Sequence, residues 1–106
     1  AAHGAKVAID WYQGPPATTN DAFWTSLAER VAEERKLRVV QARKSLGGED
    51  FAFYQEEVPG AFVLVGTGLS PALHNPSFRI DPSALAPTAH YLAELVCGAF
   101  KKEKER

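Results

Sequence analysis

The spacing of apolar residues predicts a strand and then a linker at the N-terminal end of the chain. Val7, Ile9 and Trp11 alternate with polar or small residues, which is the period of a strand with one solvent-facing side. The Gly-Pro-Pro sequence that follows cannot continue a strand ladder. We therefore expect residues 1–13 to end in a strand and residues 14–19 to form a linker.

After the linker the apolar spacing changes to every three to four residues, which predicts a helix. Asn20 is a suitable residue to cap its start, and Phe23, Leu27 and Val31 fall on one face. That face is expected to be buried, with charged residues on the opposite face.

Two short apolar runs, "LRVV" at 37–40 and "AFVLV" at 61–65, are strand candidates. The second run does not alternate, as is typical of a strand buried on both faces inside a parallel sheet. A short helix is expected between the runs, from about Glu49 until Pro59 stops it. Strand, helix and strand at this spacing predict a βαβ unit.

A final helix is expected after Asp81, which is placed to cap it with Pro82 in its first turn. Pro87 would remove a backbone hydrogen bond inside that helix, so a break or restart is predicted near residue 86. The predicted buried stripe of this helix comprises Leu85, Ala89, Leu92, Val96 and Phe100.

These elements predict an α/β fold class. Residues 20–100 would form a partial, mostly parallel sheet with flanking helices, preceded by one strand of a different unit and followed by a charged tail at 101–106.

Composition and charge narrow the range of partners. The 12 Lys and Arg residues against 13 Asp and Glu residues leave no basic excess for a phosphate backbone, so no nucleic acid is expected. No apolar run approaches the roughly 20 residues of a spanning helix, and no signal-peptide pattern opens the chain, so we expect a cytoplasmic protein without a membrane partner. Cys97, the only cysteine, is expected to be a small buried apolar residue.

Two stretches could carry chemistry. In "SLGGEDFAFY" the glycines precede Glu49 and Asp50 at a helix start, where the helix dipole favours negative charge without any catalytic role. His74 lies in a long loop after the 61–65 run, at the strand end where α/β sheets bind ligands, and could be a metal ligand or a general base there; the alternative is a solvated or capped side chain. A catalytic zinc takes three protein ligands, so these 106 residues are not expected to complete a metal site by themselves.

Taken in order, "GGEDFAFYQEEVPGAFVLVGTG" and "LHNPSFRIDPSAL" resemble the C-terminal part of a family of metal-dependent amidohydrolases. The family includes hippurate hydrolase, N-acyl-amino-acid amidohydrolase and plant hydrolases of indole-acetyl amino acid conjugates. "VAIDWYQGPPATTND" resembles the link between that family's satellite domain, which often carries a dimer contact, and its catalytic domain.

The resemblance implies that residues 1–13 are the last strand of the satellite domain and that residues 20–100 are the second half of a zinc-peptidase-like catalytic domain. His74 would be a metal ligand, and Gly48, Glu49 and Asp50 would form a wall of the substrate site. The intact enzyme would use two divalent metal ions, zinc or manganese, to hydrolyse N-acyl amino acids, a small-molecule substrate. No general base has a counterpart in this sequence, so the chain alone is expected to be inactive and without bound metal.

Two other functions stay open on the sequence. A non-catalytic α/β interaction module would leave His74 solvated, and a peptidase or deacylase of the same superfamily would act on another substrate. If the chain is half of a catalytic domain, the apolar faces that normally meet the missing half would be left exposed, so a homo-oligomer is expected.

Overall fold

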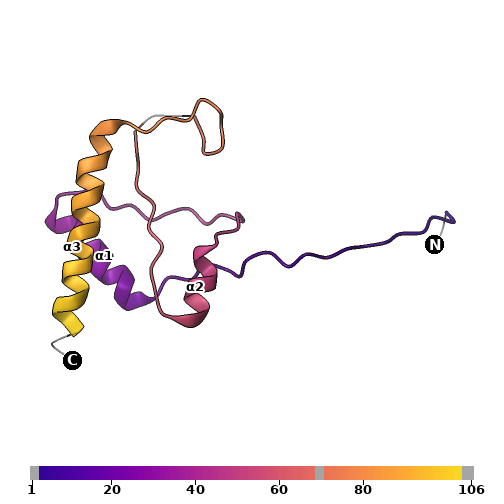
Figure 1. Cartoon of the computed structure of the whole chain (residues 1–106), viewed down its shortest axis with the longest axis horizontal. Coiled ribbons are helices and arrows are strands. Elements are labelled where there is room, and N and C mark those ends of the chain that lie inside the picture. The colour runs from indigo at the N-terminus through magenta and orange to yellow at the C-terminus, as the bar shows by residue number, and fades with distance from the viewer. Residues whose placement is uncertain (1–2, 69–70, 104–106) are drawn as a thin grey trace.

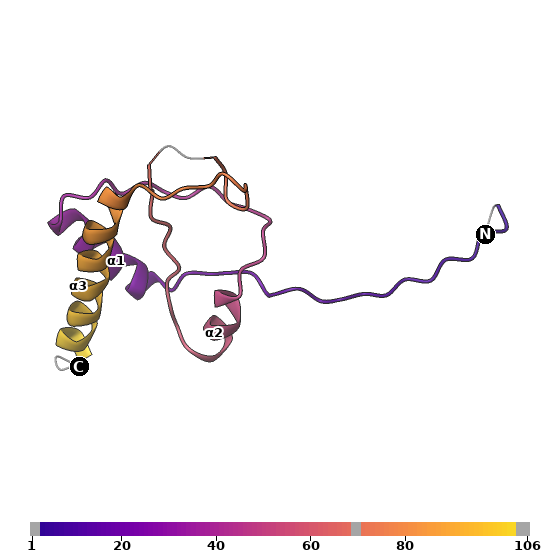
Figure 2. The same ribbon diagram turned by 45° about the horizontal axis from the view of Figure 1, so that its top comes forward.

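The computed structural model of the chain describes residues 3–68 and 71–103, which contain three α-helices and one short 3₁₀ helix (Figure 1). The helices are α1 (Ala22–Glu34), α2 (Phe51–Glu57), the 3₁₀ helix η1 (Pro82–Ala84) and α3 (Leu85–Glu103). α1 and α3 lie side by side, whereas α2 stands apart from them, joined through long uncoiled segments (Figures 1 and 2).

Local capping explains both ends of α1. The Asp21 carboxylate accepts hydrogen bonds from the backbone N–H groups of Phe23 at 3.0 Å and Trp24 at 3.1 Å, so Asp21 is the N-cap. The prediction that Asn20 caps this helix is therefore wrong by one residue. At the other end Lys36 adopts a left-handed φ of 57° and completes a Schellman turn, in which the Leu37 N–H donates to Ala32 O at 2.9 Å.

The small core lies between α1 and α3. Leu27, Val31 and Ala32 of α1 pack with Tyr91 of α3, and all four are buried. The Tyr91 hydroxyl donates a hydrogen bond to Ala28 O at 3.2 Å, and burial raises the pKa of Tyr91.

Gly98 makes the helix contact close. A Cβ atom at this position would lie 3.2 Å from Leu27 Cδ1, so the glycine allows the two helices to approach. The helical face predicted for α1 is confirmed, since Leu27 and Val31 are its most buried large residues.

The start of α3 also follows the sequence prediction. The Asp81 carboxylate accepts a hydrogen bond from the Ser83 N–H at 2.9 Å, which caps η1, and the helix type changes from 3₁₀ to α at Leu85. Pro87 consequently lies in the first turn of α3, where a missing N–H costs no intrahelical hydrogen bond.

The buried stripe predicted for α3 is wrong. Leu92, Val96 and Phe100 are 50%, 56% and 63% exposed, because α3 turns a different stripe, centred on Tyr91, toward α1. Cys97 is exposed as well, contrary to the expectation that it is buried. The helix thus has two apolar stripes, and the described chain covers only one of them.

The predicted α/β fold class is also wrong, because the described residues contain no strand. The runs 37–40 and 61–65 are uncoiled and the second is largely exposed, with Leu64 at 70%. A sheet strand requires a neighbour that pairs its backbone groups. Neither run has a paired neighbour within the described part of the chain. The apolar pattern therefore indicates surfaces that favour burial, but it does not specify which segment buries them.

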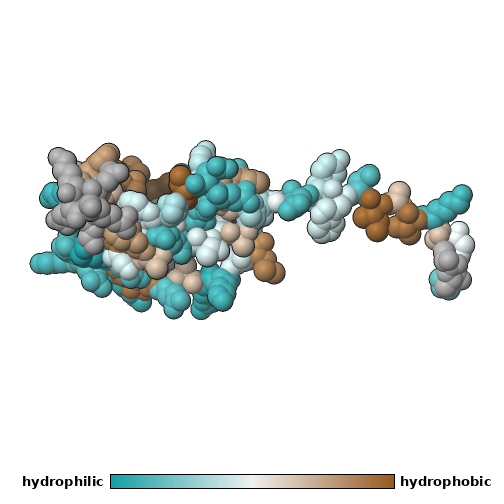
Figure 3. All heavy atoms as spheres, turned by 90° about the horizontal axis from the view of Figure 1, so that it is seen from below, coloured by the Kyte–Doolittle hydropathy of each residue, from teal (hydrophilic) through white to brown (hydrophobic). Residues whose placement is uncertain are grey.

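The molecule is extended for its length. Its radius of gyration is 19.2 Å, compared with about 13 Å for a compact chain of this size. Its accessible surface of 9686 Å² exceeds by about two-thirds the surface of a compact monomer of equal mass. Residues 3–13 stand clear of the body and carry hydrophobic residues such as Ile9, which is 80% exposed (Figures 2 and 3).

Candidate functional site

The segment that contains Gly48, Glu49 and Asp50 forms the start of α2. Glu49 accepts a hydrogen bond from the Phe51 N–H through its Oε1 at 3.2 Å and is partly buried. Asp50 is the N-cap residue but its side chain makes no capping hydrogen bond, and it is exposed. The Asp50 carboxylate is therefore the one in this segment that remains available to another group.

Gly48 lies against the linker. A Cβ atom at Gly48 would be 2.8 Å from Pro15 Cγ, which is closer than real Cβ contacts, so only glycine fits while Pro15 stays in place. The glycine is thus explained by packing between two segments that are 33 positions apart in the sequence.

The linker is also held by a set of hydrogen bonds to the residues on either side of Pro59. The Asn20 carboxamide pairs with both backbone groups of Phe62: Oδ1 accepts from the N–H at 2.8 Å and Nδ2 donates to the carbonyl at 2.9 Å. Gln55 accepts from the Thr19 N–H at 3.0 Å and donates to Gly60 O at 3.0 Å. We call these four hydrogen bonds the linker clamp.

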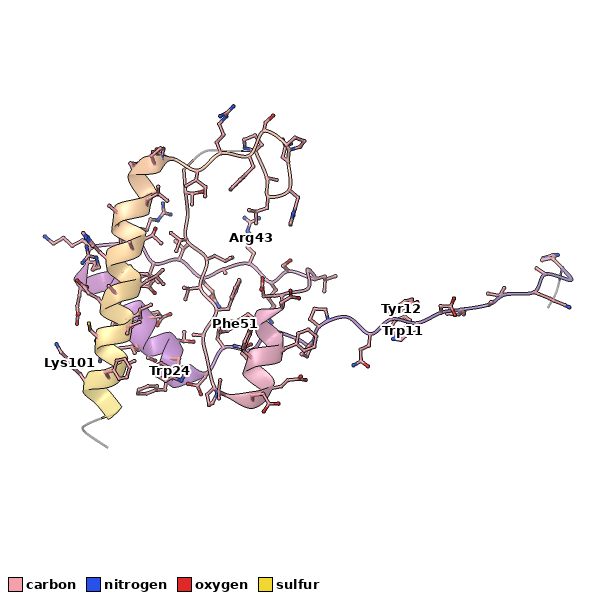
Figure 4. The ribbon with its side chains drawn as sticks, viewed as in Figure 1. Trp11, Tyr12, Trp24, Arg43, Phe51 and Lys101 are labelled. Carbon is pink, nitrogen blue, oxygen red and sulfur yellow. The ribbon has the colours of Figure 1, made fainter. Side chains whose placement is uncertain are left out.

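Aromatic packing completes this part of the candidate site. The rings of Phe51 and Phe62 lie 5.6 Å apart, and Phe51 points from α2 toward the uncoiled segment after Pro59 (Figure 4). Because Phe51 directly follows Asp50, the ring contact and the linker clamp fix the start of α2 against residues 60–62.

His74 lies in a different loop, built from two consecutive turns. The Asn75 N–H donates to Ala72 O at 3.1 Å and the Phe78 N–H donates to Asn75 O at 2.9 Å. His74 itself is exposed and has a φ of 68°, in the left-handed region that favours glycine. A residue with a Cβ costs about 1–3 kcal/mol there, and such strain is often found at functional sites.

The base of the His74 loop is closed by Asp81, whose N–H donates to Thr67 O at 3.2 Å. Hydrogen bonds from the Ser83 backbone and side chain lower the pKa of the exposed Asp81 carboxyl. The Asp81 carboxylate therefore caps the helix start at η1, while its backbone N–H closes the loop.

The structure does not join the two predicted parts of the site. No hydrogen bond among the described residues connects the side chain of His74 to Gly48, Glu49 or Asp50. Within residues 3–68 and 71–103, no group of three or more His, Cys, Asp or Glu side chains is placed to hold a metal ion. These residues do not form a metal centre by themselves, and the roles of His74 and the three wall residues stay predictions.

Sequence reasoning missed the linker clamp, although the sequence contains a signal for it. Asn20 and Asp21 both suit a helix cap, and a helix start uses only one such residue at the capping position. The spare residue is then free to bind elsewhere, and Asn20 does so through a side-chain amide that can donate and accept at once.

Comparison with known proteins gives a consistent result. The family described as Peptidase family M20/M25/M40 matches residues 5–97. The chain is 39% identical over 95 residues to N-acetylcysteine deacetylase of Bacillus subtilis, covering 90% of this chain and 25% of that protein. It is 38% identical over 94 residues to a second protein of that organism, N-acetyl-L-cysteine deacetylase, covering 89% of this chain and 23% of that protein.

A plant protein gives a further match. IAA-amino acid hydrolase ILR1-like 6 of Arabidopsis thaliana is 35% identical over 77 residues, covering 67% of this chain and 17% of that protein. The chain thus spans about a quarter or less of the length of these curated relatives. No solved structure gives a significant match. In the described part of the chain, no helix is long and apolar enough to cross a membrane.

Proposed function

Since the chain belongs to peptidase family M20/M25/M40, we propose that it forms part of a metal-dependent amidohydrolase that cleaves the amide bond of N-acyl amino acids. The observation that carries the proposal is the match over residues 5–97 to relatives named as hydrolases. N-acetylcysteine and an indole-acetyl amino acid share one bond, an amide between an acyl group and the nitrogen of an amino acid. This amide is the bond that the enzyme is proposed to hydrolyse.

His74 is the residue proposed to bind metal. Support comes from its exposed position at a φ of 68°, between two turns whose hydrogen bonds hold the backbone in place. A loop that keeps a strained histidine exposed presents an imidazole that can bind a metal ion through a ring nitrogen. The described residues supply no complete ligand set, so His74 would be one ligand among others from outside this chain.

Gly48, Glu49 and Asp50 are proposed to line the substrate side of the same site. The ring contact of Phe51 with Phe62 and the contact of Gly48 with Pro15 support a fixed wall at the start of α2. In the complete enzyme two divalent ions, zinc or manganese, would lower the pKa of bound water and polarise the amide carbonyl.

The gene itself offers the most direct test. We expect the coding sequence on the 5′ side of the codon for Ala1 to contain a stretch similar to His-Ala-Cys-Gly-His-Asp, followed by a pair of glutamates. A gene without these codons would refute the hydrolase proposal and favour a non-catalytic interaction module.

An enzymatic test follows from the same reasoning. The purified 106-residue chain, assayed with N-acetylcysteine and added Zn²⁺ or Mn²⁺, is expected to show no turnover. In the longer protein that such a gene would encode, His74→Ala should lower both bound metal and activity. His90→Ala, a matched change on α3, should alter neither. If the 106-residue chain alone showed turnover, and His74→Ala abolished it, our inference that the general base and the other metal ligands lie outside this chain would be wrong.

A further inference from the structure

Gln55 is the residue through which α2 is joined to two other segments of the chain at once. Its carboxamide accepts a hydrogen bond from the Thr19 N–H and donates one to Gly60 O, both at 3.0 Å. The side chain is half-buried, and its bond to Gly60 is partly buried as well. A neutral amide suits this place, because it donates and accepts at the same time without carrying a charge.

The acceptor that Gln55 uses is shared with α1. Gly60 O also accepts a hydrogen bond at 3.0 Å from the N–H of Asp21, the N-cap residue of α1. A carbonyl oxygen has two lone pairs, so it can satisfy both donors. The Gly60 carbonyl therefore connects the last turn of α2 to the start of α1.

The linker passes α2 and contacts it near both ends of the helix. Pro15 packs on Gly48, directly before α2, and the Thr19 N–H binds Gln55 in its last turn. Four residues of extended chain reach about 13–14 Å. The seven positions from Gly48 to Gln55 correspond to about 10 Å of helix. These lengths are similar, so the linker is long enough to hold α2 at both points without slack.

Attachment at both ends fixes the orientation of this short helix. A helix of seven residues that is held at one point can turn about that point, and a second contact prevents the rotation. Phe51 and Gln55 are four positions apart and so project from one face of α2. The contact of Phe51 with Phe62 and the bond of Gln55 to Gly60 hold that face against residues 60–62.

The two carboxylates of the proposed substrate-site wall move with α2. The Ala52 N–H donates to Glu49 O and the Phe53 N–H donates to Asp50 O, each at 3.1 Å. These bonds attach the backbone of both acidic residues to the first turn of the helix. A rotation of α2 therefore changes where both carboxylates point.

The linker is stiff enough to transmit a displacement to α2. Pro15 and Pro16 each fix φ near −65°, and proline-rich segments behave as semi-rigid spacers. A movement of the chain before Pro15 would consequently pull on Gly48 and Gln55 together, and a flexible linker would absorb it.

We propose that Gln55 is a positioning residue, which makes the orientation of the wall at residues 48–50 depend on the position of the linker by binding Thr19 and Gly60 at once. The inference rests on the proposed function only in taking residues 48–50 as the substrate-site wall. A displaced linker turns this wall and weakens substrate binding. It leaves His74 unchanged, because His74 lies in a separate loop.

NMR spectroscopy of the 106-residue chain tests the coupling without reference to activity. Gln55→Leu loses both hydrogen bonds, and Glu56→Leu, at an exposed position of α2, is the matched control. In Gln55→Leu, but not in the control, the Thr19 amide should exchange about 2–10-fold faster. Pro16→Gly, which loosens the linker, should shift the amide signals of residues 48–50. The shift should be at least about twofold smaller in a Gln55→Leu background.

Two results of the NMR experiment would overturn the proposal. If Pro16→Gly shifted the signals of residues 48–50 equally in both backgrounds, Gln55 would not couple the linker to the wall. If the Thr19 amide exchanged at the wild-type rate in Gln55→Leu, the bond that joins the linker to α2 would be absent in solution.

Steady-state kinetics of the longer protein separate positioning from stability. With N-acetylcysteine as substrate, Gln55→Leu should raise KM about 5–10-fold while kcat and bound metal change by less than about twofold. A purely structural role would instead lower kcat, through loss of folded enzyme, and leave KM unchanged. Gln55→Glu keeps the acceptor for the Thr19 N–H and should recover part of the loss in KM.

The two experiments distinguish failure of this inference from failure of the proposed function. A wild-type longer protein without amide hydrolysis would refute the proposed function, and the amide signals would still decide whether Gln55 couples the linker to residues 48–50. An active enzyme in which Gln55→Leu leaves KM unchanged would refute the positioning role and retain the hydrolase.

Discussion

Removal of the Asn20 carboxamide is the most informative perturbation of the observed fold. In Asn20→Ala the Phe62 backbone loses the acceptor of its N–H at 2.8 Å and the donor to its carbonyl at 2.9 Å. A net intramolecular hydrogen bond contributes about 0.5–1.5 kcal/mol. Both bonds are exposed to solvent, so water can replace them in part. The expected local loss is therefore about 1–2 kcal/mol, toward the lower end of the two-bond total.

Amide hydrogen exchange measures this loss at one residue. A local loss of 1–2 kcal/mol predicts that the Phe62 amide exchanges about 5–30 times faster in Asn20→Ala than in the wild type. The Asp21 amide, which donates to Gly60 O at 3.0 Å beside the clamp, should also lose protection. Exchange within the centre of α3 should change little, because the α1–α3 core does not include Asn20.

Two further variants separate the parts of the interaction. Asn20→Asp keeps an acceptor for the Phe62 N–H but loses the donor to its carbonyl, so the amide should stay protected while the overall stability falls. Asn75→Ala makes the same chemical change in the His74 loop, where the Asn75 side chain accepts a hydrogen bond from the nearby Ser77 N–H at 2.8 Å. If the Phe62 amide exchanged at the same rate in Asn20→Ala as in the wild type, the linker clamp would be refuted. The same conclusion would follow if Asn20→Ala and Asn75→Ala changed the exchange rate of the Phe62 amide equally.

The remaining predictions concern backbone conformation, close packing and pH. Lys36→Gly should raise the free energy of unfolding by about 1 kcal/mol, because φ at this exposed position is 57°, and Lys36→Ala should bring no gain in denaturant titrations. Gly48→Ala should lower stability by about 1–3 kcal/mol through the contact at 2.8 Å with Pro15, and a Pro15→Ala background should relieve most of that loss. The lowered pKa of Asp81 means that its cap stabilises η1 fully above the unfolded value of 3.8 and is lost as pH falls through the lower folded value. Circular dichroism at acidic pH should show that loss of helix, and Asp81→Asn should make the transition shallower.

The sequence predicted the helices well because their signals are local. Asp81 was assigned as a cap and Leu27 as part of a buried face, and the structure agrees with both. Near the break predicted at residue 86 the helix changes from 3₁₀ to α at Leu85 without interruption. Caps and first-turn prolines depend on a few adjacent residues, and a face of a helix depends on spacing that is set by the helix itself.

The strands and the candidate site could not be predicted in the same way, because each requires contacts between segments that are distant in sequence. The runs at 37–40 and 61–65 have strand composition, but no neighbour pairs them within the described residues, so the α/β prediction is wrong. His74 and Asp50 were predicted to line one site, and whether they meet depends on how two loops are placed. The left-handed φ of His74 could not be predicted either, because residues other than glycine rarely adopt it and no local sequence pattern indicates it here.

The sequence alone therefore determined where this chain forms helices, which faces of it are apolar and, through its motifs, which family it resembles. Only the tertiary structure decided which apolar stripe of α3 is covered, since two stripes are available and α1 packs on the one that carries Tyr91. It also decided that Asn20 binds the Phe62 backbone instead of capping α1. Apolar periodicity indicates that a surface favours burial. Which segment packs against that surface depends on contacts between residues distant in sequence, and no local pattern specifies these contacts.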